Sequence, residues 1–179
     1  MKWIAFFSQT GTEILNVSKK LGKLPDKIIT NASVGSINKE LIASKPVIFT
    51  IDNPSPGDYR QLIEDSTDTI ITLHGWLRII PPEICKEYTI WNLHPGLITR
   101  YPELKGKDPQ KKVIESKKKK YEQIGLVIHR VIPEVDAGNV ELEMSTCNTF
   151  YNVDSLTSVL HEMATSAWLK FFSTRNECY

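Results

Sequence analysis

An asparagine and a histidine stand two residues apart where an apolar run ends, in the stretch IWNLHPGL at residues 90–97. If the run forms a strand, alternation directs the side chains of Asn92 and His94 to the same side. An imidazole can move a proton near neutral pH, and an amide N–H can stabilise a carbonyl oxygen that becomes negatively charged. The competing interpretation is structural: Asn92 caps a turn, and His94 is a core histidine with satisfied hydrogen bonds.

A nucleophile is missing from this pattern. No serine, cysteine or lysine is an evident partner of His94, which favours direct attack by a bound substrate over a covalent acyl-enzyme. A third candidate is Asp136 in EVDAGNV, residues 134–140, because a carboxylate can orient an imidazole or accept an amine proton. An ordinary turn aspartate is the alternative here.

The stretch SQTGTE at residues 8–13 joins an apolar run to a helix-like segment. A glycine-containing turn of this kind presents backbone N–H groups at a helix start, where a phosphate can bind. It matches neither a Walker loop nor a GxGxxG fingerprint. Helix capping by Thr10 or Thr12 explains the same residues equally well.

The elements that must position these residues alternate in the first half between short apolar runs and helix-like stretches. This order predicts an α/β domain with a parallel sheet, and ligands of such sheets bind beyond the carboxyl ends of the strands. We expect strands at 3–7, 27–30, 46–51, 68–75 and 88–94, and helices at 11–22, 37–44 and 56–65.

The second half has a different pattern. Residues 125–132 and 139–146 predict an antiparallel hairpin, and apolar residues at helical spacing predict a final helix over 154–172. Asp154 or Asn152 is the expected cap of that helix. The charge run KKVIESKKKKYEQ, 111–123, predicts a solvated helix end and loop, with a polyanion contact as the alternative.

Composition narrows the function classes. The net charge of +1 argues against a nucleic-acid binder that acts through bulk charge. The 3 cysteines lack the spacing of a disulfide framework or a zinc site, and the 4 histidines are too scattered to indicate a metal. The N-terminal apolar run is too short to span a membrane. We therefore expect a single cytoplasmic domain, 1–179, without nucleic-acid or membrane partners.

Three stretches in this order resemble the folate-dependent formyltransferases: HGWLRIIPPEI at 74–84, NLHPGLITRYPELKG at 92–106, and EVDAGNV at 134–140. The resemblance covers nearly the whole chain and is greatest to the purine-synthesis branch, the phosphoribosylglycinamide formyltransferases. It implies a mostly parallel Rossmann-like sheet with helices on both faces, extended by an antiparallel hairpin and a final helix. It also implies a Rossmann-like half, 1–88, and a catalytic and folate-binding half, 89–179.

The resemblance further implies roles for single residues. Asn92 would stabilise the oxyanion, His94 would assist it and protonate the leaving nitrogen, and Asp136 would hold the imidazole or a water. The cosubstrate would be 10-formyltetrahydrofolate, the default acceptor glycinamide ribonucleotide, and the candidate assembly a homodimer, with no metal. Folate contacts would fall on Trp76, Leu77, Arg78, Ile79 and Val135, and acceptor contacts on Thr10, Gly11, Thr12, Glu13 and Glu162; from the residues alone, Glu162 is a solvated helix residue.

Several positions depart from the family pattern. Glu13 stands where the purine enzyme has asparagine, and a carboxylate beside a bound phosphate needs neutralisation. His74 replaces a small residue, Ile124 replaces a histidine, and Gly96 and Thr99 alter the stretch after His94. The loop KGKDPQKK also differs. These departures suggest another acceptor, such as an amino sugar nucleotide or a modified nucleotide. A silent folate- or nucleotide-binding protein and a formate-releasing hydrolase are the further alternatives.

Overall fold

A computed structural model describes residues 2–64, 68–116 and 120–176. The chain forms two compact units. The first runs to Asn92 and also includes Val131–Pro133; the second holds the remainder, from Leu93 to Arg130 and from Glu134 onwards. The short return segment joins the first unit through Val131, whose N–H donates to the carbonyl oxygen of Ile90 at 2.8 Å.

The first unit contains five parallel strands. Continuous apolar runs form them, as expected for strands buried on both faces; all of Trp3–Phe7 is buried. In the register, Phe6 pairs with Leu73 and Leu73 pairs with Asn92, so neighbouring strands end close together. The strands are β1 (Lys2–Phe7), β2 (Lys27–Thr30), β3 (Ile48–Phe49), β4 (Thr69–Leu73) and β5 (Ile90–His94).

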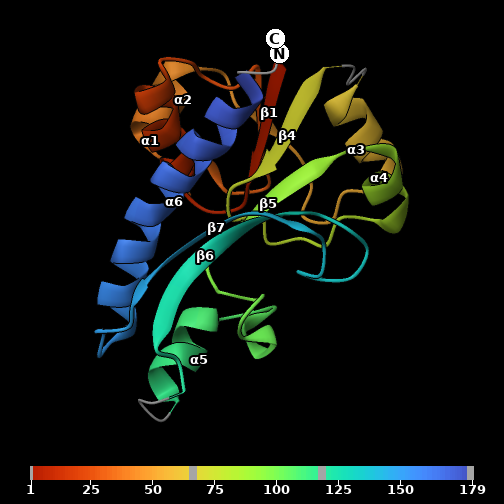
Figure 1. The fold of residues 1–179 in the computed structure, drawn as a ribbon. Coiled ribbons are helices and arrows are strands. Elements are labelled where there is room, and N and C mark those ends of the chain that lie inside the picture. Colours follow the sequence, from red (N-terminus) through yellow and green to blue (C-terminus); the bar gives the residue numbers. More distant parts are fainter. Residues whose placement is uncertain (1, 65–67, 117–119, 177–179) are drawn as a thin grey trace. The chain divides into compact units, whose positions relative to one another are not determined.

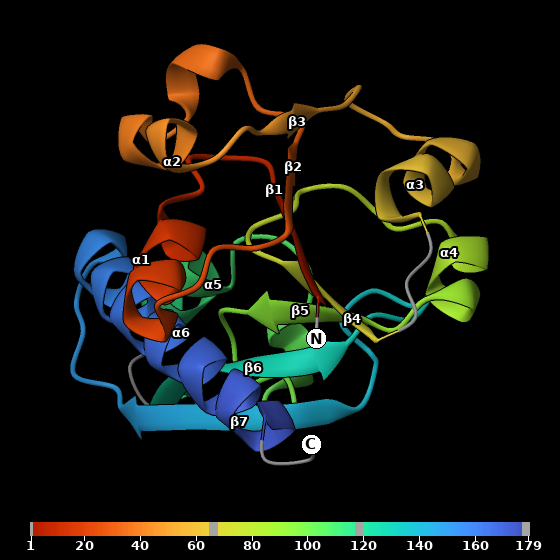
Figure 2. The same cartoon turned by 90° about the horizontal axis from the view of Figure 1, so that it is seen from above.

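Four helices cover the strands of this unit. Figures 1 and 2 both place α1 and α2 on one face and α3 and α4 on the other. Ser55 and Asp58 form a capping box at the start of α3, and Pro56 lies in its first turn as predicted. The helices are α1 (Thr12–Leu21), α2 (Lys39–Ser44), α3 (Pro56–Ile63) and α4 (Pro82–Glu87), with a short 3-10 turn at Val34–Ser36.

The second unit is built on an antiparallel pair. β6 (Gln123–Arg130) pairs with β7 (Val140–Cys147), with Leu126 opposite Met144. The long helix α6 (Val153–Asn176) runs beside this pair (Figure 1). Asn152 caps α6, because its Oδ1 accepts from Ser155 N at 2.8 Å; the alternative cap, Asp154, lies inside the first turn. A 3-10 turn (Pro102–Leu104) and α5 (Pro109–Glu115) precede β6.

The strand order is β3-β2-β1-β4-β5-β6-β7, which confirms a mostly parallel sheet extended by an antiparallel pair and a final helix. Two element predictions were inaccurate. The strand predicted over 46–51 is confined to Ile48–Phe49, whose exposed side chains show that little apolar burial supports it. Helix α4 was not predicted, because six residues after two prolines carry no readable period.

The charge run predicted over 111–123 begins within α5 and includes 117–119, which lie outside the described residues. Lys120, also part of this run, forms an ion pair with Glu103 at 2.9 Å. Within the described ranges, no helix combines the length and apolar character needed to cross a membrane.

Candidate active site

His94 ends β5 as a buried residue with 5% exposure. Its Nδ1 lies 3.1 Å from Asp136 Oδ2, and its Nε2 lies 2.9 Å from the carbonyl oxygen of Leu104. Both neighbours are hydrogen-bond acceptors, so each ring nitrogen is placed to act as an N–H donor. The structure therefore brings two of the predicted site residues, His94 and Asp136, into contact.

Asp136 lies in the turn after β6 with a φ of 49°, a left-handed conformation that aspartate tolerates better than most residues. Its side chain is 11% exposed. The backbone N–H of Gly106 donates to Oδ2 at 2.9 Å, and His129 Nε2 lies 3.3 Å from Oδ1. One carboxylate thus joins two imidazoles and a backbone amide.

His129 was not predicted as a site residue. It lies on β6, is 2% exposed, and its Nδ1 lies 3.0 Å from the carbonyl oxygen of Arg130. The sequence carries a weak signal for it, since a histidine inside an apolar strand needs a buried partner and the nearest downstream carboxylates include Asp136. Its pairing could not be inferred without the path of the turn between β6 and β7.

Burial and charge act in opposite directions on this cluster. Burial lowers the pKa of His94 below its ordinary value, although the charge of Asp136 and the Leu104 carbonyl favour the protonated ring. Burial would raise the pKa of Asp136, but the hydrogen bond from His129, the charge of His94 and the amide of Gly106 together hold that pKa below its usual range. Asp136 is therefore a carboxylate at neutral pH.

Asn92 belongs to the same strand as His94, two residues earlier, and is half-buried. Strand alternation directs the two side chains to one side. In the first unit Asn92 pairs with Leu73, the last residue of β4, which directly precedes His74.

The turn before α1 has the expected glycine at its tightest point. Gly11 has a φ of 71°, and a Cβ there would lie 2.5 Å from Leu41 Cδ2, so a larger residue would not fit. The N-cap of α1 is Gly11, which has no side-chain cap, so the expected capping by Thr10 or Thr12 was wrong. Thr10 Oγ1 instead accepts from Thr12 N at 3.3 Å within the turn, and Asn38 N donates to the Thr10 carbonyl oxygen at 2.9 Å.

Glu13, in the first turn of α1, is held by His74. Its Oε1 lies 2.7 Å from His74 Nδ1, and the His74 side chain is fully buried. The other ring nitrogen, Nε2, lies 2.9 Å from Thr72 Oγ1, which accepts from Trp3 Nε1 at 2.7 Å. Because a carboxylate can only accept, the contact places a ring N–H of His74 on Glu13.

The segment expected to contact folate follows β4. Trp76 is buried in the core of the first unit and donates from Nε1 to Tyr59 Oη at 3.0 Å, so its side chain is structural. Leu77 and Ile79 are 60% and 68% exposed. Arg78 Nε donates to the Asp52 carbonyl oxygen at 2.5 Å. In the second unit, Val135 is 50% exposed.

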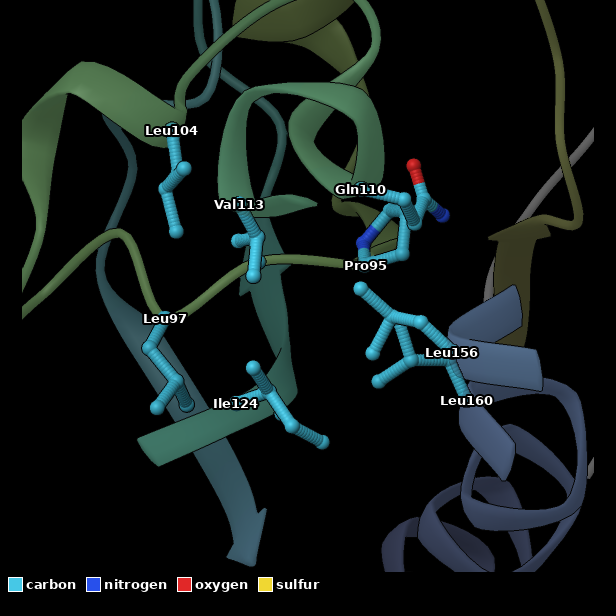
Figure 3. A pocket seen from close by; sticks show the side chains of 10 residues that line it. Pro95, Leu97, Leu104, Gln110, Val113, Ile124, Leu156 and Leu160 are labelled. Atoms are coloured by element: carbon cyan, nitrogen blue, oxygen red, sulfur yellow. The ribbon is translucent and has the colours of Figure 1, made fainter. Parts of the chain in front are cut away.

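The second unit holds a small apolar pocket, in which Gln110 is the one polar side chain labelled (Figure 3). Ile124 lines it and is 3% exposed, so this departure from the family pattern falls in the core. Glu162 is exposed on α6, as expected from the sequence alone. Across the described part of the chain, no group of three or more His, Cys, Asp or Glu side chains is arranged to hold a metal ion.

The mostly parallel sheet, extended by an antiparallel pair and a final helix, is the fold that the family resemblance implied. The chain belongs to the formyl transferase family, whose model matches residues 10–168. This confirms the family resemblance found in the sequence.

The chain is similar to a phosphoribosylglycinamide formyltransferase of Dictyostelium discoideum, with 38% identity over 86 residues. That match covers 44% of this chain and only 41% of the relative. The fold resembles the phosphoribosylglycinamide formyltransferase of Anaplasma phagocytophilum, with a TM-score of 0.78 and 20% identity over 95% of this chain and 84% of that one. It also resembles a formyltetrahydrofolate deformylase of Pseudomonas syringae pv. tomato, with a TM-score of 0.73 and 15% identity over 94% and 59% of the two chains.

Proposed function

We propose that this protein transfers the formyl group of 10-formyltetrahydrofolate to a primary amine by direct attack. The observation that carries the proposal is the buried His94–Asp136 pair at the end of β5, 3.1 Å apart, in a chain of the formyl transferase family. Asn92 on the same strand supplies the amide that an oxyanion needs.

In this mechanism the amine nitrogen attacks the formyl carbon, and the carbonyl oxygen becomes an oxyanion. The Asn92 side-chain N–H stabilises that charge. The His94 ring adds to it only in the fraction of molecules in which the ring is protonated, because burial lowers its pKa below the ordinary value. As the intermediate collapses, the bond from carbon to the folate N10 breaks. N10 then takes the Nε2 proton of His94, which is hydrogen-bonded to the Leu104 carbonyl oxygen before the substrate binds. Asp136 holds the imidazole and receives the proton that the attacking amine loses, directly or through a water. The products are a formamide and tetrahydrofolate.

The folate would be recognised largely through main-chain groups after β4, because the Trp76 side chain is committed to the core. The exposed Leu77 and Ile79 offer apolar side chains to its ring. Arg78 is braced against Asp52 and keeps the segment in place.

Glycinamide ribonucleotide is the reference acceptor, because the similar protein of Dictyostelium discoideum carries its name. In this assignment the turn of Thr10, Gly11 and Thr12 would receive the phosphate through backbone N–H groups, and Glu162 would hold the ribose.

The Glu13–His74 contact favours a second candidate acceptor. A carboxylate fixed in the first turn of α1 would repel a phosphate seated there. An acceptor that presents a hydroxyl or cationic group to this turn, such as an amino sugar nucleotide, would meet no such repulsion.

One assay separates these candidates. The protein is incubated with 10-formyltetrahydrofolate and a panel of primary amines that includes glycinamide ribonucleotide and its dephosphorylated form, and tetrahydrofolate formation is followed. Turnover with any amine supports formyl transfer. The ratio of the rates with glycinamide ribonucleotide and with its dephosphorylated form decides the acceptor class. Release of formate without an amine would instead identify a hydrolase and contradict the proposal.

A further inference from the structure

A loop of the second unit contacts both members of the buried pair. The carbonyl oxygen of Leu104 accepts from His94 Nε2 at 2.9 Å, and the N–H of Gly106 donates to Asp136 Oδ2 at 2.9 Å. Because two backbone groups only two residues apart make these bonds, a small shift of the loop would disturb the imidazole and the carboxylate together.

Lys112 of α5 fastens this loop. Its ammonium group donates to the Glu103 carbonyl oxygen at 3.0 Å and to the Lys105 carbonyl oxygen at 2.8 Å. These two carbonyls flank Leu104. An ammonium has three donors and makes stronger bonds than a neutral amide, so one side chain can fix the loop on both sides of the residue that contacts His94.

Gly96 makes the close approach of the loop possible. A Cβ at this position would lie 3.2 Å from His94 Nε2 and 3.2 Å from Leu104 Cβ, tighter than ordinary packing. Gly96, which has no side chain, leaves room for the Leu104 carbonyl beside the imidazole. Lys112 holds that carbonyl in place.

We propose that Lys112 is a positioning residue that holds the Leu104 carbonyl on His94 and the Gly106 amide on Asp136. The proposal rests on the proposed function in so far as this pair is catalytic. Lys112 itself touches no reacting atom. It keeps the imidazole supplied with two acceptors, which counters the effect of burial and favours the protonated ring. The Nε2 proton then passes from the Leu104 contact to the leaving folate nitrogen.

The test is the titration of His94 by NMR in Lys112→Met, in the full chain without substrate. Three groups act on the ring besides burial and the Leu104 carbonyl: Asp136, His129 and Lys112. The Leu104 bond favours the protonated ring, whereas the Lys112 charge disfavours it. If Lys112 positions the loop, its loss releases the carbonyl and the pKa of His94 falls. If Lys112 acts only through its charge, the pKa rises.

Matched variants complete the experiment. Lys111, the residue before Lys112, is exposed and pairs with Glu115 at 3.7 Å. Lys111→Met should leave the titration of His94 and kcat unchanged. Lys112→Arg retains a charged donor and should restore the wild-type titration. With the proposed substrates, kcat of Lys112→Met should fall by about 10- to 100-fold, because a misplacement of roughly 1 Å can cost about 10²-fold.

A rise or no change in the pKa of His94 would overturn the proposal, even if kcat fell. A fall in that pKa, with no formyl transfer by any variant including the wild type, would leave Lys112 as the positioning residue and reject the proposed function instead. If Lys112→Met does not fold, Lys112→Gln, which keeps one shorter neutral donor, is titrated in its place under the same criteria.

Discussion

His94 is surrounded in a way that fixes its orientation before any substrate arrives. Its two nitrogens face a carboxylate and a carbonyl, and its ring is buried. A rotation of the ring would exchange both acceptors for carbon contacts, so the orientation is set by two bonds rather than one. This is what a proton-transfer group needs, because its geometry must be in place at the moment of reaction.

Replacing His94 by alanine should reduce kcat by roughly 10²–10⁴-fold, the usual contribution of a general acid–base. The chain should remain folded, since His94 ends its strand and the buried Asp136 carboxylate keeps its contacts with the Gly106 amide and His129. Steady-state kinetics with 10-formyltetrahydrofolate measures kcat, and circular dichroism shows whether the chain is folded. An exposed histidine on α6 provides the control, His161→Ala, which should retain wild-type turnover. Comparable rates for the two variants would remove His94 from the mechanism.

Spacing alone related residues that are close along the chain, whereas the distant Asp136 was assigned to the His94 imidazole through the family resemblance. Asn92 and His94 share a strand, and their common direction follows from a period of two. His129 was missed because its contact with Asp136 depends on how the turn after β6 folds back. The bond between His74 and Glu13 was missed for a similar reason, since it joins residues that the sequence separates widely and only the β1–β4 pairing brings together.

At the scale of elements, the second unit depends on one close approach. Gly125 of β6 lies against β7, and a Cβ at this position would overlap the Met144 carbonyl oxygen and come within 2.9 Å of Leu97 Cδ2. No rotamer change can relieve a clash with backbone. The glycine therefore sets the spacing of the antiparallel pair and supports the chain that carries His94 and Leu97.

Gly125→Ala should lower the free energy of unfolding by about 1–3 kcal/mol, the usual range for overpacking a well-filled core. Urea denaturation followed by circular dichroism measures the change. Gly35→Ala is the matched substitution, because a Cβ there meets nothing within 4 Å; its effect should stay within about 0.5 kcal/mol. Equal stability of the two variants would show that β6 and β7 can separate without cost.

Elements were predictable where burial is continuous. The runs that became β1, β2, β4 and β5 are apolar and short, and α6 shows a helical period over its middle. The predicted range was too long at the edge strand β3, whose Ile48 and Phe49 are exposed. The prediction failed at α4, because local capping by prolines leaves no period to recognise.

For the molecule as a whole, the buried histidine links stability to pH. The pKa of His94 in the folded chain is below its ordinary value of 6.5, chiefly through burial. Between these two values the unfolded chain binds more protons than the folded one, so lowering the pH favours unfolding. Asp136, whose pKa is also lowered, adds a second loss only as the pH falls through its ordinary value of 3.8.

We therefore expect the free energy of unfolding to fall as the pH is lowered through 6.5, by at most about 1.4 kcal/mol per pH unit for this one group. Urea titrations at a series of pH values from about 7.5 downwards measure the slope. His94→Gln should flatten it, whereas His161→Gln, which removes an exposed histidine, should not. A slope that persists in His94→Gln would assign the effect to another group.

The contacts from Trp3 through Thr72 and His74 to Glu13 have one further consequence. They form a polarisable chain that begins at a donor, the indole, and ends at an acceptor, the Glu13 carboxylate. A charged group bound beside Glu13 would polarise each hydrogen bond of this chain in turn. The indole N–H resonance of Trp3 should therefore act as a built-in reporter, shifting when an acceptor occupies the start of α1, although Trp3 itself is buried inside the sheet.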